Sequence, residues 1–125
     1  MSNKELALKA ITDVFVHRDM TAFDKYFSGN YIQHNPSIPN GTEILKQFVP
    51  ALPADFRYEP GLVTESGDFV MIHGRYNNWN GKNMIAVDIF KIANGKLTEH
   101  WDVLQEEITA DKTANGNAMF PIQEK

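Results

Sequence analysis

Residues 84–92 read Met-Ile-Ala-Val-Asp-Ile-Phe-Lys-Ile, and after Ala93-Asn-Gly95 the chain continues Lys96-Leu-Thr-Glu-His-Trp-Asp102. β-Branched and aromatic residues are common in both segments, and the Asn-Gly pair between them is typical of a tight β-hairpin turn. One acid, Asp88, interrupts the first segment. Because burying a carboxylate without a partner is unfavourable, Asp88 needs a compensating group close by. The sequence therefore predicts a hairpin that carries a buried polar site.

Two registers are open for this hairpin. A two-residue turn at 94–95 sets Asp88 opposite Trp101, whereas a bulged three-residue loop at 93–95 sets Asp88 opposite His100. We favour the bulged register, because directly opposed side chains lie about 5 Å apart and can share a hydrogen bond. This register also places polar and apolar side chains together on one face of the hairpin: Ala86, Asp88, Phe90, Thr98, His100, Asp102 and Leu104.

The rest of the chain divides into helices followed by strands. Apolar residues recur at helical spacing behind a capping box at Ser2 and Glu5, which predicts a helix to about residue 17. A second helix is expected over 21–27 and a third between an Asn40 cap and Pro50, with a short strand at 31–35 between them. From residue 57 the apolar period is two, which predicts strands at 57–65, 69–77, 83–93 and 96–107. The predicted class is α+β, with three helices on a strongly bent, mostly antiparallel sheet.

Composition limits the classes of function. At 125 residues the chain is expected to form a single domain, residues 1–125, in which residues 108–125 are a tail that covers a pocket or joins a dimer. The net charge is −4 and the 12 Lys and Arg are scattered, so nucleic acid is not expected as a partner. No apolar run approaches the roughly 20 residues that span a bilayer, and no signal peptide is visible, so we expect a cytoplasmic protein. Zero cysteines exclude thiolate nucleophiles and disulfides.

Five segments, taken in order, resemble the SnoaL-like polyketide cyclase family: Tyr31-Ile-Gln-His-Asn-Pro36, Asn40-Gly-Thr-Glu43, Val87-Asp-Ile-Phe90, Asn94-Gly-Lys-Leu-Thr-Glu-His-Trp-Asp-Val103 and Ala114-Asn-Gly-Asn-Ala-Met-Phe120. That family belongs to the nuclear-transport-factor-like, or ketosteroid-isomerase-like, superfamily. The resemblance implies a cone-shaped domain enclosing a pocket that is open at one end. It also implies acid–base chemistry without metal or organic cofactor, such as aldol cyclisation, isomerisation or dehydration. Because the same fold hosts binding proteins, the resemblance alone does not establish catalysis.

By motif position, the resemblance places His34 and Asn35 at the pocket mouth and Asp88 and His100 on its strands. We predict that the proton carriers are Asp88, His100, His34 and Asp102. The side chains expected to bind the substrate, which they suggest is partly hydrophobic, are Asn35, His73, Phe48, Met71, Phe90 and Leu104. Each has a structural reading as well: Asp88 at a sheet edge, His34 fixing the turn at Pro36, and His100 with Asp102 as a pair at the rim.

These expectations lead to two hypotheses for function. The first is an aldol cyclase or isomerase in which Asp88 or His100 takes a proton next to a carbonyl and His34 stabilises the enolate. The second is a binding or accessory protein with no turnover. No metal is expected, because no His-x-His or His-Glu-x-x-His spacing occurs. Apolar residues expected on the outer face of the sheet, Trp101 and Val103 with Trp79 nearby, predict a homodimer.

Overall fold

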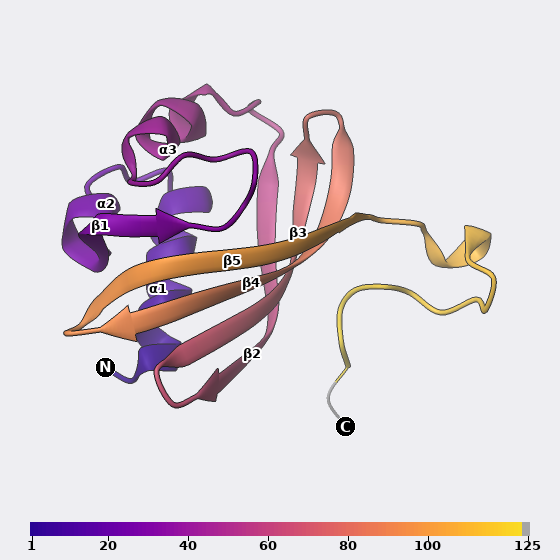
Figure 1. Cartoon of the computed structure of the whole chain (residues 1–125). Helices are drawn as coiled ribbons and strands as arrows, with labels where there is room; N and C mark the ends of the chain where they lie inside the picture. The colour runs from indigo at the N-terminus through magenta and orange to yellow at the C-terminus, as the bar shows by residue number, and fades with distance from the viewer. Residues whose placement is uncertain (124–125) are drawn as a thin grey trace.

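A computed structural model describes residues 1–123. Three helices, α1 (Asn3–Phe15), α2 (Ala22–Tyr26) and α3 (Glu43–Phe48), lie on one face of a curled five-stranded sheet (Figure 1). We call the helix-covered face the inner face and the opposite face the outer face. The α+β class, the three helices and the bent sheet that the sequence predicted are confirmed. No helix in residues 1–123 is long and apolar enough to cross a membrane.

The sheet is a meander with one added strand. Strands β2 (Arg57–Ser66), β3 (Phe69–Trp79), β4 (Lys82–Ala93) and β5 (Lys96–Glu106) pair antiparallel in chain order. Strand β1 (Phe27–Gln33) joins β5 in parallel, so the order across the sheet is β1-β5-β4-β3-β2. The sequence placed this strand at 31–35, several residues too late, because Phe27 continues the apolar pattern of α2.

The β4–β5 hairpin corrects the predicted register. Asn94 and Gly95 both have positive φ, 54° and 72°, as a two-residue hairpin turn requires. Past this turn the ladder skips Thr98, which is extra on β5 and donates its hydroxyl to the carbonyl of Lys91. Asp88 therefore lies opposite Asp102, and neither predicted register is right. The bulge nevertheless restores the even spacing that keeps Asp88 and His100 on the inner face, because His100 pairs with Phe90, two residues from Asp88.

The helices begin and end for local reasons. Ser2 caps α1, with Ser2 and Glu5 bonded reciprocally as the capping box predicts, and the apolar stripe of α1 is buried. The cap predicted for α3 is wrong, because Thr42 precedes that helix without a side-chain cap. Asn40 instead accepts a hydrogen bond from the backbone of Gln33, at 2.9 Å, and so ties the loop after β1 to that strand.

The core fills the space between the helices and the inner face. Its largest fully buried side chains come from both layers: Val14 on α1, Tyr31 on β1, Val49 after α3, Val70 and Ile72 on β3, Phe90 on β4 and Leu97 on β5. Apart from tyrosines, Asp88 and His100 are the polar residues buried in this core within residues 1–123, at 3% and 6% exposed. Because polar groups are buried only with partners, these two residues mark the point where the core becomes a site.

The tail returns to the outer face of the sheet. After β5 the chain runs away from the body, forms a short 3₁₀ turn (Ala110–Lys112) and comes back (Figure 1). Phe120 is buried there between His73, with ring centroids 5.6 Å apart, and Arg75, whose guanidinium lies 4.7 Å from the Phe120 ring centre. Glycine at position 61 makes room for this ring, because a Cβ would lie 2.9 Å from it. The tail thus packs on the side away from the helices.

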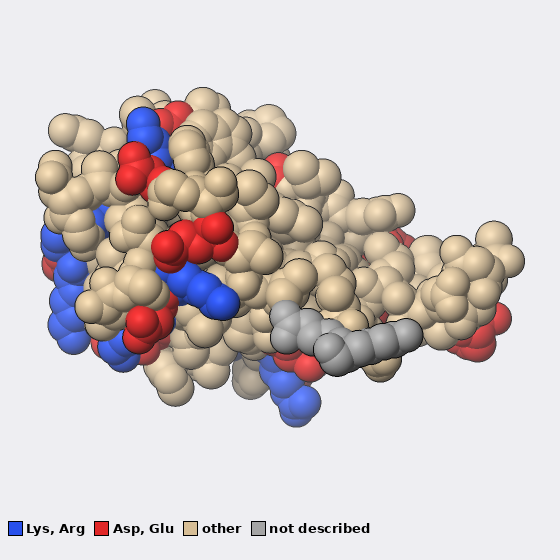
Figure 2. Space-filling view, turned by 90° about the horizontal axis from the view of Figure 1, so that it is seen from below, with Lys and Arg blue, Asp and Glu red and all other residues tan. Residues whose placement is uncertain are grey.

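Charges of both signs are interspersed on the side of the molecule seen in Figure 2, where acidic and basic side chains alternate without a continuous basic stripe. Nucleic-acid binding relies on such a stripe to neutralise phosphates. The distribution on this side agrees with the weak net charge of −4.

The outer face remains the expected dimer contact. It exposes Phe69, Met71 and Val103, by 36%, 38% and 70%, whereas Trp79 lies on the inner side and does not contribute as predicted. We expect Val103→Lys to shift the protein from two chains to one chain per particle in light scattering, since a buried lysine charge opposes association. The control, Val16→Lys, changes an exposed valine at the end of α1 and should leave the particle mass unchanged. A wild-type mass of one chain at micromolar concentration would rule out the dimer.

Candidate functional site

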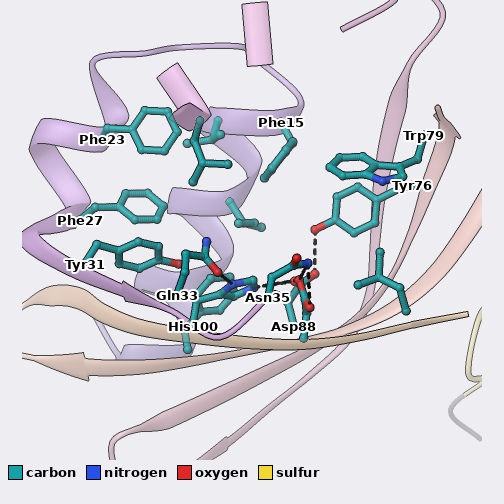
Figure 3. Close-up of a pocket in the computed structure, with 16 residues that line it drawn as sticks. Phe15, Phe23, Phe27, Tyr31, Gln33, Asn35, Tyr76, Trp79, Asp88 and His100 are labelled. Atoms are coloured by element: carbon teal, nitrogen blue, oxygen red, sulfur yellow. Dashed lines mark hydrogen bonds and ion pairs between the residues drawn. The ribbon is translucent and has the colours of Figure 1, made fainter. Parts of the chain in front are cut away.

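A small cavity lies between the helices and the inner face of the sheet (Figure 3). Its volume is about 40 Å³. Aromatic rings line it from two sides, with Phe23, Phe27 and Tyr31 opposite Tyr76 and Trp79. The polar side chains gather over the strands: Gln33, Asn35, Asp88, His100 and Asp102. The remaining lining is apolar and comes from α1, α3, β4 and β5: Ile11, Val14, Phe15, Leu45, Phe90 and Leu104.

Asp88 is the centre of a buried hydrogen-bonded chain. One carboxylate oxygen lies 2.8 Å from Nε2 of His100, and the other accepts the hydroxyl of Tyr76 at 2.7 Å. Nδ1 of His100 lies 2.8 Å from the amide oxygen of Gln33. The hydrogen bond between Asp88 and His100 that the sequence predicted is therefore present. The chain runs from β3 through β4 and β5 to β1, so four strands position it.

His100 is held at both ring nitrogens. Nε2 faces a carboxylate oxygen of Asp88, and Nδ1 faces the side-chain amide of Gln33. A carboxylate hydrogen-bonded to an imidazole fixes the orientation of the ring and can share a proton with it. This is the arrangement of a general acid–base pair.

Asp102 lies beside the pair and has a different environment. Its oxygens accept two hydrogen bonds from the Asn35 amide, at 3.1 and 2.9 Å, and its Oδ2 lies 3.8 Å from Nε2 of His100. Burial raises the pKa of the Asp102 carboxyl, and the negative charge of Asp88 adds to the rise, whereas Asn35 and His100 lower it. Asp102 is thus a carboxylate whose raised pKa makes it more basic than usual, and it lies next to the hydrogen-bonded Asp88–His100 pair.

The raised pKa predicts a pH-dependent stability. A carboxyl group whose pKa is higher in the folded chain than its ordinary 3.8 lowers the free energy of unfolding as pH rises from 3.8 through the folded-state pKa. Asp102→Asn removes this titration, so the variant should gain stability relative to the wild type between about pH 3.5 and 7. Urea unfolding at both pH values measures the difference, and a difference independent of pH would contradict the assignment. Asp111→Asn, which removes an exposed acid on the tail, is the control.

The structure brings six of the predicted site residues to this cavity. They are Asn35, Asp88, Phe90, His100, Asp102 and Leu104. Sequence reasoning missed Gln33 and Tyr76, although both bond directly to the central pair. The signal for Tyr76 was its place on a strand that pairs with the Asp88 strand. The signal for Gln33 was its position next to His34 within the same quoted motif.

His34 does not reach the cavity, which corrects its predicted place at the mouth. Its ring stacks on Trp101 with centroids 4.6 Å apart, and its Nε2 lies 2.6 Å from a carboxylate oxygen of Glu99. Trp101 and Glu99 alternate with His100 along β5, so they point to the outer face. Gln33, the last residue of β1, and Asn35 just beyond it line the cavity, whereas His34 between them faces away.

Three further predicted residues lie elsewhere. His73 and Met71 alternate with buried Ile72 on β3, so they belong to the outer face, where His73 meets Phe120. Phe48 is 38% exposed on α3 and packs edge-on against Trp79, which lines the cavity, whereas Phe48 does not. None of these three side chains lines the cavity, so their predicted binding roles are not part of the site described here.

Within residues 1–123, one group of side chains has the spacing of a metal site: Asp88, His100 and Asp102, whose ligand atoms lie within 4.8 Å of one another. A metal ion would have to replace the bond between Asp88 and His100 and the bonds from Asn35 to Asp102. We therefore expect elemental analysis of untagged protein to find no stoichiometric zinc, iron or manganese. One tightly held equivalent that is lost in the Asp102→Asn variant would identify these residues as ligands instead.

Comparison with known proteins gives a family match and a set of similar structures. The sequence matches the SnoaL-like domain family over residues 8–100. A search of curated proteins found none that matches. An NTF2-like protein of unknown function from Cytophaga hutchinsonii has a TM-score of 0.71 at 20% identity, over 84% of this chain and 91% of that one.

Two other similar structures carry functional names. A candidate polyketide cyclase from Acidithiobacillus ferrooxidans has a TM-score of 0.67 at 17% identity, over 83% of this chain and 91% of that one. A candidate ketosteroid isomerase from Kribbella flavida has a TM-score of 0.70 at 14% identity, over 85% and 79% of the two chains. At these identities the likeness extends to the fold.

Proposed function

Because the chain belongs to the SnoaL-like domain family, we propose that its buried Asp88–His100 pair performs acid–base catalysis on a carbonyl compound, in the manner of an aldol cyclase or isomerase. The single observation that carries this proposal is the buried hydrogen bond between Asp88 and His100, at the wall of a cavity and beside a second carboxylate. Similar structures named as candidate cyclase and isomerase support the same class of chemistry. No cofactor takes part in the proposed steps.

The environments of the two acids suggest their roles. Asp102 is the base, because its raised pKa makes its carboxylate a better proton acceptor. It removes a proton from the carbon next to the substrate carbonyl. The Asp88–His100 pair is the acid, and it donates its proton to the carbonyl oxygen as the enol forms. Return of the proton from Asp102 to a different carbon, while the enol gives its O–H proton back to the Asp88–His100 pair, yields the isomer. When the enol instead attacks a second carbonyl, the enol oxygen returns its proton to the pair and Asp102 protonates the new alkoxide, which yields the aldol product.

The neighbouring residues hold these groups in position. Asn35 donates both bonds to Asp102 and keeps the carboxylate facing the cavity. Tyr76 and Gln33 hold the two ends of the Asp88–His100 pair. His34, to which the sequence gave the enolate-stabilising role, lies on the outer face, so the proposal assigns that role to the pair itself.

Deuterium exchange tests the proposal without knowledge of the substrate. The protein is incubated with 2-butanone, cyclohexanone or 2-tetralone in deuterated buffer, and deuterium next to the carbonyl is measured by mass spectrometry. We expect at least one ketone to exchange faster than in buffer, and we expect heat-unfolded protein to lose the effect. Exchange at the buffer rate for every ketone that binds would favour the second function, a binding protein without turnover. The small volume of the cavity, about 40 Å³, is the observation that favours this second function.

A further inference from the structure

The cavity is small. Its volume is about 40 Å³, although sixteen residues line it. A cavity of this volume has room for a few water molecules. Pockets for drug-sized ligands have volumes of about 300–1,000 Å³. A ligand of several fused rings therefore does not fit between these walls.

The walls are built from side chains that support one another. On one side the ring of Phe27 packs against Phe23 and Tyr31, with centroids 5.0 and 5.1 Å apart. On the other side Tyr76 packs against Phe15 and Trp79, with centroids 5.6 and 5.3 Å apart. Four of these rings are almost fully buried, and the hydroxyl of Tyr76 is fixed by Asp88. Because close-packed interiors resist expansion, enlarging the cavity requires several rings to move together.

The charge of the lining also selects among ligands. Its titratable side chains besides tyrosine are Asp88, His100 and Asp102, and the lining contains neither Lys nor Arg within the described part of the chain. Two carboxyl groups face the cavity against one imidazole, so with both acids ionised the lining is negative even if His100 carries a proton. A carboxylate or phosphate on the ligand would face this charge without a cation to compensate, at a high cost in a buried site.

We propose that the site takes a small uncharged carbonyl compound, a ketone, aldehyde or diketone of about three to five carbon atoms. This inference rests on the proposed function, which supplies the requirement for a carbonyl group. The size limit comes from the aromatic walls, and the preference for a neutral ligand comes from Asp102. The polar residues on the strand side receive the carbonyl, and the rings of Phe27 and Tyr76 contact the carbon chain (Figure 3).

The test uses three probes that separate size from charge. The first probe, 2,3-pentanedione, is neutral and small, whereas 2-oxobutyrate has the same number of non-hydrogen atoms and carries a carboxylate. The third, 2-tetralone, is neutral but bicyclic. Binding is followed by the indole N–H signal of Trp79, which lines the cavity, in NMR titrations. The indole signal of Trp101 on the outer face is the internal control.

We expect 2,3-pentanedione to shift the Trp79 signal saturably while the Trp101 signal stays in place. The other two probes should bind at least tenfold more weakly. In Leu45→Ala, or in Val14→Ala if that variant does not fold, a wider cavity should bring 2-tetralone closer in affinity to 2,3-pentanedione. Equal affinity of wild-type protein for 2-tetralone or for 2-oxobutyrate would overturn the size limit or the charge preference. Failure of 2,3-pentanedione to bind would overturn both.

Deuterium exchange in the same samples separates this inference from the proposed function. Binding of 2,3-pentanedione without exchange would refute the catalytic proposal and leave the ligand class standing. Exchange of 2-tetralone at a similar rate to 2,3-pentanedione would support catalysis and overturn the ligand class. The two proposals can therefore fail independently.

Discussion

Asp88→Asn should lower ketone deuterium exchange by about 10²–10⁴-fold, the usual contribution of a general acid. The substitution removes the carboxylate that is hydrogen-bonded to His100 at 2.8 Å, so the proposed acid loses one of its two members. Asparagine has nearly the same shape and creates no buried charge, so the fold should persist. His100 should also lose its ring proton at lower pH than in the wild type, because the neighbouring negative charge is gone.

Exchange and the histidine NMR titration give two separate readouts of this change. Asp13→Asn is the matched control, because Asp13 is an acid on α1 that pairs with Lys9 at the surface. It should leave both readouts unchanged. If Asp88→Asn leaves the titration of His100 as it was, the two side chains do not communicate, and Asp88 has a structural role only. If the titration moves but exchange persists, the proton donor is another group.

Tyr76→Phe should destabilise the protein by about 1–3 kcal/mol, whereas Tyr58→Phe should cost little or nothing. The two rings lie side by side with centroids 4.7 Å apart, and both are almost fully buried. The Tyr76 hydroxyl donates to Asp88, and its loss leaves a buried carboxylate oxygen without that partner. The Tyr58 hydroxyl has no hydrogen-bond partner within residues 1–123, so phenylalanine removes a polar group that already lacks one.

Urea unfolding of the two variants and the wild type measures this contrast at one pH. Because both substitutions remove one oxygen from neighbouring buried tyrosines, the change in apolar packing is matched. Equal losses would show that Asp88 does not depend on the Tyr76 hydrogen bond. In the exchange assay, Tyr76→Phe should slow turnover less than Asp88→Asn, since Tyr76 positions the acid without sharing its proton.

The inner face of the hairpin was predictable because of the cost of burying Asp88. That cost required a partner, and only registers with even spacing place Asp88 and His100 on one face. The residue opposite Asp88 was not predictable, because it depends on both the turn type and the bulge at Thr98. The bulge restores the even spacing that the two-residue turn alone would remove. Strand limits from residue 57 onward were predicted within a few residues, since Gly with Asn or Asp separates the strands at each turn.

The positions of His34, Met71 and His73 were not predictable for a different reason. On β3, apolar residues occupy both faces, with Phe69 and Met71 alternating with Val70 and Ile72, so the period of two does not tell which face is inward. On β1, the register against β5 shifts between Phe27 and Ile32. Only that long-range pairing decides that Gln33 and Asn35 point inward. Trp79 turns inward because the β3–β4 ladder is irregular after Tyr76.

The bulge at Thr98 has a consequence for insertions and deletions. Since Thr98 is the one unpaired residue between Gly95 and His100, a deletion within 96–99 would give a regular hairpin in which His100 still pairs with Phe90. A deletion between His100 and Asp102 would instead send Asp102 to the outer face and replace it with Val103. Related sequences that differ in length within 96–99 can therefore share this site. Related sequences with a gap between the positions of His100 and Asp102 have different pockets.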